Sequence, residues 1–161
     1  MKTDRTDRHI LKVLQRDGRL SKVRLAEEVN LSTSPAWERV KRLEEAGIIT
    51  GYHAAVDFKK LTSLTRVKVE IVLKHHRRED FARFENLVMS IDEIVCCEAV
   101  GGGVDYILTV LTRDIDCYQR LIDELLQAEP GIDRYYSYIV TKTIKDDSRA
   151  LMEQLLDELP D

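Results

Sequence analysis

The order in which the hydrophobic period changes between residues 65 and 144 limits the fold of this chain more than any other feature. Side chains alternate along residues 65–73, with Val67, Val69, Ile71 and Leu73 on one side and Arg66, Lys68 and Glu70 on the other. This period of two predicts a strand with one buried face. The same reading predicts further strands at 94–100, 104–111 and 132–144, and helices at 79–90 and 114–128. The order βαββαβ predicts a ferredoxin-like domain, an antiparallel four-stranded sheet with both helices on one face.

The second face of this sheet is expected to stay open. Residues 94–100 and 104–111 are apolar on both sides of the strand, so the open face should include many apolar or aromatic side chains. An open apolar face is an association surface. We therefore expect a homodimer with twofold symmetry that forms through the sheets.

Residues 4–46 show the pattern of three short helices. Negative charge from Asp4 and Asp7 favours the start of the first helix, 4–16, and Ser21 is the expected N-cap of the second. Asn30 suits the positive φ of a sharp corner, and the third helix begins within 32–35 and ends at Gly47. Residues 48–52 then indicate the first strand of a wing. The fold class is therefore α+β, an N-terminal winged helix-turn-helix joined to the ferredoxin-like domain.

The third helix has the composition of a DNA-reading helix. Ala36, Val40 and Leu43 form a narrow buried stripe, and the side chains expected on the opposite side are Glu38, Arg39 and Arg42, with Lys41 beside them. Arginine can bond guanine bidentately in the major groove or contact a phosphate. The first turn, Ser32, Thr33, Ser34 and Pro35, is placed to hold a phosphate at a helix N-terminus. Trp37 either packs on the scaffold, which we favour, or lies against a sugar.

Charge is divided between the two halves of the chain. Residues 1–60 carry 13 Lys and Arg against 9 Asp and Glu, whereas residues 61–161 carry 12 against 20, within a total net charge of −4. A basic front and an acidic back indicate two modules, of which only the first faces phosphate. The plainer alternative for residues 4–46 is a small helical bundle with a solvated charged surface.

These patterns divide the chain into four parts: the helix-turn-helix domain 1–56, a polar linker 57–64, the sheet domain 65–145 and an amphipathic C-terminal helix 146–161. The leucine stripe of that last helix needs a partner, either its own domain or another dimer. No apolar run is long enough for a transmembrane helix, and the charged N-terminus is unlike a signal peptide, so a cytoplasmic protein is expected.

The chemistry-bearing residues point away from an enzyme. Cys96, Cys97 and Cys117 lack the spacing of a zinc site or disulfide framework and are interpreted as small buried residues, with redox sensing as the alternative. The four histidines have no metal-ligand spacing. The sequence contains no nucleophile–base set, no Walker loop and no dinucleotide fingerprint. We therefore expect no catalytic residues, no metal and no cofactor.

Residues 32–44 (Ser-Thr-Ser-Pro-Ala-Trp-Glu-Arg-Val-Lys-Arg-Leu-Glu) and 47–52 (Gly-Ile-Ile-Thr-Gly-Tyr) resemble the Lrp/AsnC family, as does the opening 4–11. The second half, through Val100-Gly-Gly-Gly-Val-Asp-Tyr-Ile-Leu108, resembles the family's ligand-sensing RAM domain (regulation of amino-acid metabolism). The resemblance covers nearly the whole chain in the right order. It implies a sequence-specific transcription regulator that forms dimers and higher oligomers such as octamers. A twofold dimer that presents two DNA-reading helices matches a pseudo-palindromic operator.

The resemblance also implies a small-molecule effector, an amino acid or a derivative, bound near the Gly-x-x-Asp-Tyr turn. This turn corresponds to Gly102, Gly103, Val104, Asp105 and Tyr106. Asp105 either pairs with a ligand amine or caps the turn through backbone N–H groups, and the glycine N–H groups either bind a carboxylate or only form the turn. Family members often have a polar residue at the position of Gly103 and an aromatic at that of Val104, so the pocket here is expected to be larger or less polar.

Two other functions remain to be compared with ligand-modulated regulation. An architectural, nucleoid-type protein would also bind DNA in a salt-dependent manner, but with little ligand control. Only a ligand-modulated regulator would show a saturable shift in operator affinity or oligomer size with a metabolite. An enzyme built on the sheet domain is disfavoured, since Asp105 and the nearby tyrosines are too few for acid–base catalysis.

Overall fold

A computed structural model describes residues 2–128, 130–146 and 149–159 and divides the chain into two compact units. The N-terminal unit comprises Met1–Ala55 together with Lys145–Asp161, and the sheet unit comprises Val56–Ile144. The end of the chain is thus part of the same unit as its beginning. Each unit is described separately below.

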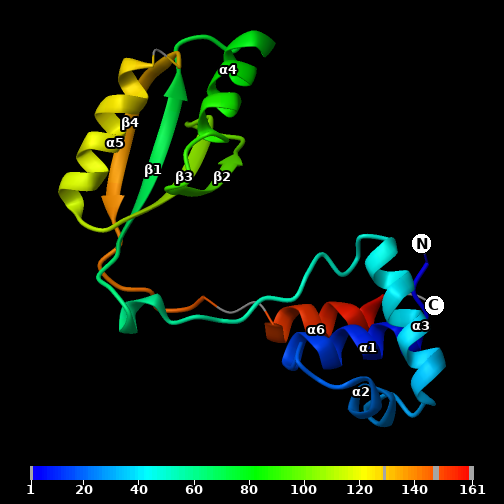
Figure 1. Cartoon of the computed structure of the whole chain (residues 1–161). Helices are drawn as coiled ribbons and strands as arrows, with labels where there is room; N and C mark the ends of the chain where they lie inside the picture. The colour runs from blue at the N-terminus through cyan, green and yellow to red at the C-terminus, as the bar shows by residue number, and fades with distance from the viewer. Residues whose placement is uncertain (1, 129, 147–148, 160–161) are drawn as a thin grey trace. The chain divides into compact units, whose positions relative to one another are not determined.

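The N-terminal unit consists of helices α1 (Arg5–Arg16), α2 (Lys22–Glu28), α3 (Thr33–Glu45) and α6 (Arg149–Glu158) (Figure 1). Both expected N-caps are present. Asp4 forms a reciprocal capping box with Asp7, and the Ser21 side chain accepts a hydrogen bond from the Arg24 N–H. The core is apolar and joins the first three helices, with Ile10, Leu25, Val40 and Leu43 at its centre.

The wing strand expected at 48–52 is absent, and among residues 46–57 the structure shows no strand. Gly47 ends α3 with a φ of +67°, and the N–H groups of Ile48 and Ile49 both donate to the Leu43 carbonyl. The Tyr52 hydroxyl then donates to the Glu44 carboxylate. A strand needs a second strand beside it, and within this unit the described residues supply none, so the segment is held to α3 by these bonds instead.

The sheet unit confirms the expected ferredoxin-like order. Its elements are β1 (Thr65–Leu73), α4 (Arg78–Val88), β2 (Ile94–Ala99), β3 (Tyr106–Thr112), α5 (Ile115–Gln127) and β4 (Ile132–Ile139), with a single turn of 3-10 helix, η1 (Phe58–Lys60), ahead of them (Figure 1). The strand order is β2-β3-β1-β4, and each neighbouring pair is antiparallel. Both helices cover one face, because Phe84 of α4 and Ile122 of α5 pack in one core with Val69 and Leu108.

The open face of the sheet is more polar than expected. Lys68 of β1 donates to Thr109 of β3 over 2.6 Å, and Tyr138 of β4 donates to Glu70 over 3.1 Å. Tyr136 and Tyr138 are about half exposed there, so aromatic area is present, but it is interleaved with charge. The last strand also stops at Ile139 instead of 144, since its pairing with β1 ends at Val67. The pairing of β1 with β4 places Lys68 beside Tyr138 and Glu70 beside Tyr136.

Helix α6 lies along α1 (Figure 1). The sequence left open whether this helix covers its own domain or another dimer. In the structure it contacts α1 of the N-terminal unit, through Arg16 to Glu153 and Lys12 to Asp157. Across the residues that the structure describes, no helix is both long and apolar enough to span a membrane.

Candidate functional site

The helix-turn-helix is formed by α2, a tight corner and α3. Asn30 takes the left-handed conformation expected of it, with φ 54°, and the N–H of Leu31 returns to the Ala26 carbonyl over 2.9 Å. Ala36 and Val40 are buried against α1 and α2. Because side chains four and seven residues apart share a helix face, burial of Ala36, Val40 and Leu43 turns Ser34, Glu38 and Lys41 outward.

The first turn of α3 is available to an anion. Ser32, Thr33, Ser34 and Pro35 are all exposed, and Ser32 is the N-cap residue without making a side-chain cap bond. The hydroxyl groups and first N–H groups of this turn therefore have no hydrogen-bond partner among the residues that the structure describes. Such a turn is suited to bind a phosphate oxygen.

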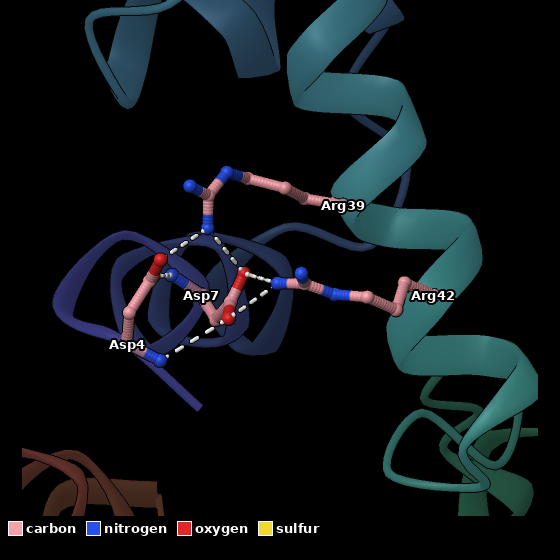
Figure 2. A network of polar contacts seen from close by, with 4 residues as sticks. All are labelled: Asp4, Asp7, Arg39 and Arg42. Atoms are coloured by element: carbon pink, nitrogen blue, oxygen red, sulfur yellow. Dashed lines mark hydrogen bonds and ion pairs between the residues drawn. The ribbon is translucent and has the colours of Figure 1, made fainter. Parts of the chain in front are cut away.

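Arg39 and Arg42 lie differently from the sequence expectation. Figure 2 shows both guanidinium groups directed at α1, where they meet the carboxylates of Asp4 and Asp7. Arg39 Nη1 donates to Asp4 Oδ2 over 2.6 Å and to Asp7 Oδ1 over 2.8 Å. Arg42 Nη2 donates to both oxygens of Asp7, over 2.9 and 2.7 Å. Arg39 thus lies on the flank of α3 that faces α1 and not on the outward side.

Burial divides this cluster unequally. The Asp7 side chain is 1% exposed, whereas the side chains of Arg39 and Arg42 are 29% and 50% exposed. The Asp7 backbone N–H and the Arg39 guanidinium hold the pKa of Asp4 below its ordinary value, and Asp4 and Asp7 raise the pKa of Arg39. A buried carboxylate needs such partners, so the arginines stabilise the contact between α1 and α3. The sequence indicated only the capping role of these two aspartates.

Two other side chains of α3 are now placed. Trp37 is half-buried against the helical core, which agrees with the packing interpretation, and Lys22 Nζ lies 4.0 Å from its ring centroid. Lys41 is exposed and makes no ion pair or hydrogen bond with any residue that the structure describes. It is therefore the cation of α3 most available to an external anion.

The glycine turn of the sheet unit is exposed. Gly102 has a φ of +151°, which side-chain-bearing residues rarely adopt, but Gly101 and Gly103 do not need a special φ. A Cβ atom at any of the three would meet no atom within 4 Å. Val104 and Asp105 are half-buried, and Tyr106 is buried. Nothing within the described chain requires glycine at 103, so the space beside it is open to a ligand or another molecule.

Asp105 is strongly engaged within its own unit. Its Oδ2 accepts the N–H of Leu73 over 2.8 Å, and the His76 ring lies 3.0 Å from its Oδ1. Its backbone N–H also donates to Ile71 over 2.8 Å. The carboxylate therefore ties the end of β1 to the start of β3 through a backbone N–H of Leu73, which lies outside the glycine turn.

A groove of about 760 Å³ lies beside this turn, between α4 and the ends of β2 and β3. Its lining includes two groups that the sequence had not singled out, Arg78 and Glu85, together with Phe81, Val100, Asp105 and Tyr106. The Tyr106 hydroxyl donates to Glu85 over 2.7 Å, and burial together with this contact raises the pKa of Tyr106. The signal that could have found Arg78 and Glu85 is their spacing of seven residues, which places both on one face of α4.

The remaining candidates do not gather into a site. Within the described ranges, no group of three or more His, Cys, Asp or Glu side chains is placed to hold a metal ion. The three cysteines form no disulfide and are half-buried, less covered than expected. For Cys96 and Cys97 the reason is that β2 is an edge strand, whereas Cys117 lies in the first turn of α5. Burial raises the pKa of the Cys97 thiol, which disfavours the reactive thiolate.

Family models match both units. Residues 3–50 match the winged helix-turn-helix DNA-binding model, and residues 66–150 match the Lrp/AsnC ligand binding domain. Transcriptional regulatory protein DoeX from Halomonas elongata is 54% identical over 151 residues, which cover 94% of this chain and 96% of DoeX. The leucine-responsive regulatory protein of Escherichia coli K12 is 38% identical over 150 residues, 93% of this chain and 92% of that protein.

A solved structure shows the same arrangement of elements. The transcriptional regulator NMB0573 from Neisseria meningitidis, crystallised as an L-Met complex, is 30% identical with a TM-score of 0.83. The match covers 92% of this chain and 96% of that one. The helix-turn-helix and the sheet unit described above therefore occur together in proteins that regulate transcription.

Proposed function

Because this chain belongs to the Lrp/AsnC family of DNA-binding transcription regulators, which carry a ligand-binding domain and are not enzymes, we propose that an amino acid or an amino-acid-derived metabolite modulates its DNA binding. The regulated genes would then serve the metabolism of amino acids or related nitrogen compounds. The names of two relatives support this choice, one being a leucine-responsive protein and the other an L-Met complex. We expect it to act in the cytoplasm, where bacterial DNA is located.

The groove beside the glycine turn carries this proposal. It combines a cation, Arg78, with the carboxylates of Glu85 and Asp105 over an apolar floor that includes Phe81. An amino acid presents a carboxylate and an ammonium group together, and both form charge-assisted hydrogen bonds with partners of opposite sign. We assign the ligand carboxylate to Arg78 and the ammonium group to Glu85.

The residues of the turn would act around this pair. Gly102 and Gly103 would offer backbone N–H groups, while Val104 and Tyr106 would shape the wall of the site. Asp105 would act chiefly by holding the turn, because its carboxylate already accepts from Leu73 and contacts His76. In this proposal Glu85 takes over the ammonium contact that the sequence assigned to Asp105.

On the DNA side, the exposed surface of α3 would enter the major groove. The first turn, Ser32, Thr33, Ser34 and Pro35, would hold a phosphate, and Glu38 and Lys41 would face the bases. Arg42, half exposed, would add a contact without leaving Asp7, and Arg39 would mainly position α3. We propose a homodimer formed through the open sheet face, reading a pseudo-palindromic operator, with assembly into higher oligomers such as octamers.

The test is binding to the DNA upstream of the protein's own gene, titrated with and without a panel of amino acids and their breakdown intermediates. One compound should shift the binding curve, and Arg78→Gln and Glu85→Gln should each abolish that shift. Arg77→Gln, an adjacent charge change outside the groove lining, is the control and should keep it. Binding that no compound shifts would favour the architectural alternative, which no present observation supports.

A further inference from the structure

A basic stripe runs the length of α1 on the side away from the core. It consists of Arg5, His9, Lys12 and Arg16, which follow one another at intervals of four, three and four residues. This spacing places all four on one helix face, opposite the buried Ile10. The stripe extends over about 16 Å at 1.5 Å per residue.

Helix α6 covers the second half of this stripe with two carboxylates. Arg16 contacts Glu153 bidentately, Nε to Oε1 over 2.9 Å and Nη2 to Oε2 over 2.7 Å. Lys12 pairs with Asp157, and the Lys12 side chain is 17% exposed. The carboxylates lie four residues apart on one face of α6, so both basic residues are engaged by the same helix.

Ion pairs form the polar part of this cover. Among the apolar side chains of α6, Leu151, Met152 and Leu155 remain about half exposed, whereas Leu156 is more covered. The three half-exposed side chains contribute little to the contact with α1. Ion pairs with one solvent-exposed partner, such as Arg16 and Asp157, add little stability and weaken as salt screens them. The contact is therefore of a kind that a competing anion can replace.

The first half of the stripe stays open. Arg5, Arg8 and His9 line a groove of about 790 Å³ together with Lys12, Asn30 of the helix-turn-helix corner, and Asp157. Arg5 and His9 are exposed and have no partner among the residues described. The groove thus continues the stripe from the α6 contact to the corner between α2 and α3.

We propose that the basic stripe of α1 is a second DNA-contacting surface, which binds backbone phosphates, and that the acidic face of α6 competes with DNA for Lys12 and Arg16. The inference rests on the DNA binding described above. Phosphate oxygens accept the same bidentate hydrogen bonds from arginine that Glu153 accepts now. Since one DNA strand presents a phosphate every 3.4 Å along the axis, a stripe of about 16 Å spans several of them.

The test is the salt dependence of DNA binding by the full chain. Glu153→Gln combined with Asp157→Asn frees Lys12 and Arg16 without touching the core. Each additional phosphate contact steepens the slope of log affinity against log salt by about 0.9, so the slope should become more negative by up to about 2. Affinity at low salt should rise at the same time. Glu158→Gln is the matched control and should keep the wild-type slope, because among the residues described the Glu158 carboxylate contacts only Gln154 on the same helix.

A second variant distinguishes direct phosphate contacts by Lys12 and Arg16 from the general effect of removing negative charge from α6. Adding Lys12→Gln and Arg16→Gln to the α6 double variant should return the slope to the wild-type value or below it. If the steeper slope persists there, or if the α6 double variant keeps the wild-type slope, the proposed competition is wrong. Failure of the wild-type protein to bind DNA would instead contradict the DNA-binding function itself.

Discussion

The carboxylate of Asp7 on α1 accepts hydrogen bonds at both oxygens from a single nitrogen of Arg42 on α3, over 2.9 and 2.7 Å. Asp7 is buried and Arg42 is half exposed, so one end of the pair belongs to the core and the other to the surface (Figure 2). Arg39 reaches the same carboxylate. The orientation of α3 therefore depends on a charge of α1.

Replacing Asp7 with Ala should destabilise the N-terminal unit. Loss of the buried acceptor leaves Arg42 without its carboxylate and Arg39 with Asp4 alone, and losing hydrogen bonds to a charged group costs about 1.5–3 kcal/mol. Fluorescence of Trp37, the only tryptophan in the sequence, reports on this unit during urea unfolding. Asp17→Ala, an exposed aspartate beyond the end of α1, is the control. Equal midpoints for the two variants would show that the Asp7 cluster does not stabilise the unit.

Lys41 and Arg39 should differ in how they affect DNA binding. Lys41→Ala should lower DNA affinity at unchanged stability and, if Lys41 contacts a phosphate, reduce the salt slope by about 1. Arg39→Ala should lower both stability and affinity, because Arg39 holds α3 to α1. Unfolding and DNA titrations at one fixed salt concentration separate these effects. If Arg39→Ala keeps wild-type stability but lowers DNA affinity, Arg39 contacts DNA directly.

Substitutions in the glycine turn should distinguish a glycine that the backbone conformation requires from one that only leaves space beside the turn. Gly102→Ala should destabilise the sheet unit by about 1–3 kcal/mol, since its φ is nearly restricted to glycine. Gly103→Ala should leave stability within about 0.5 kcal/mol of the wild type, because a Cβ there meets nothing. The same substitution should weaken the response to the effector. A wild-type response in Gly103→Ala would show that the open space at this turn is not part of the site.

Asp105→Ala should be mainly a stability variant. Its carboxylate accepts the Leu73 N–H in a half-buried position, so its removal should cost about 1–3 kcal/mol in the sheet unit. His76→Ala removes the exposed partner and should cost less. Circular dichroism during urea unfolding measures both. If Asp105→Ala keeps wild-type stability but loses the effector response, the ligand-binding alternative for Asp105 is correct.

The stability of the N-terminal unit should depend on acid pH through Asp4. Its folded pKa lies below the ordinary value of 3.8, so its contribution is fully present above that pH. The contribution is lost as the pH falls from 3.8 through the lower, folded pKa. Asp4→Ser keeps an N-cap oxygen but does not titrate, and its Trp37 unfolding midpoint should decline less over this window. A parallel decline in both proteins would assign the acid sensitivity to other groups.

The sequence alone determined the fold class, because the helices and strands of both units are predicted by local patterns of a few residues. The strand at 65–73 has the same bounds in the structure as in the prediction, Asn30 has the predicted positive φ, and Gly47 follows the end of α3 as predicted. The first turn of α3 is exposed as predicted. These features depend on local conformational preference and on the hydrophobic period. Both can be read from one short stretch of the sequence.

Only the tertiary structure decided which charged groups meet. Arg39 and Arg42 were expected to face outward, but Asp4 and Asp7 lie more than 30 residues away in the sequence and turn them toward α1. Arg78 and Glu85 line one groove with Asp105 and Tyr106. Glu153 and Asp157 contact Arg16 and Lys12 across most of the chain. Charge acts over distance in space and has no period in the sequence, so its partners are known only once the helices and strands are packed.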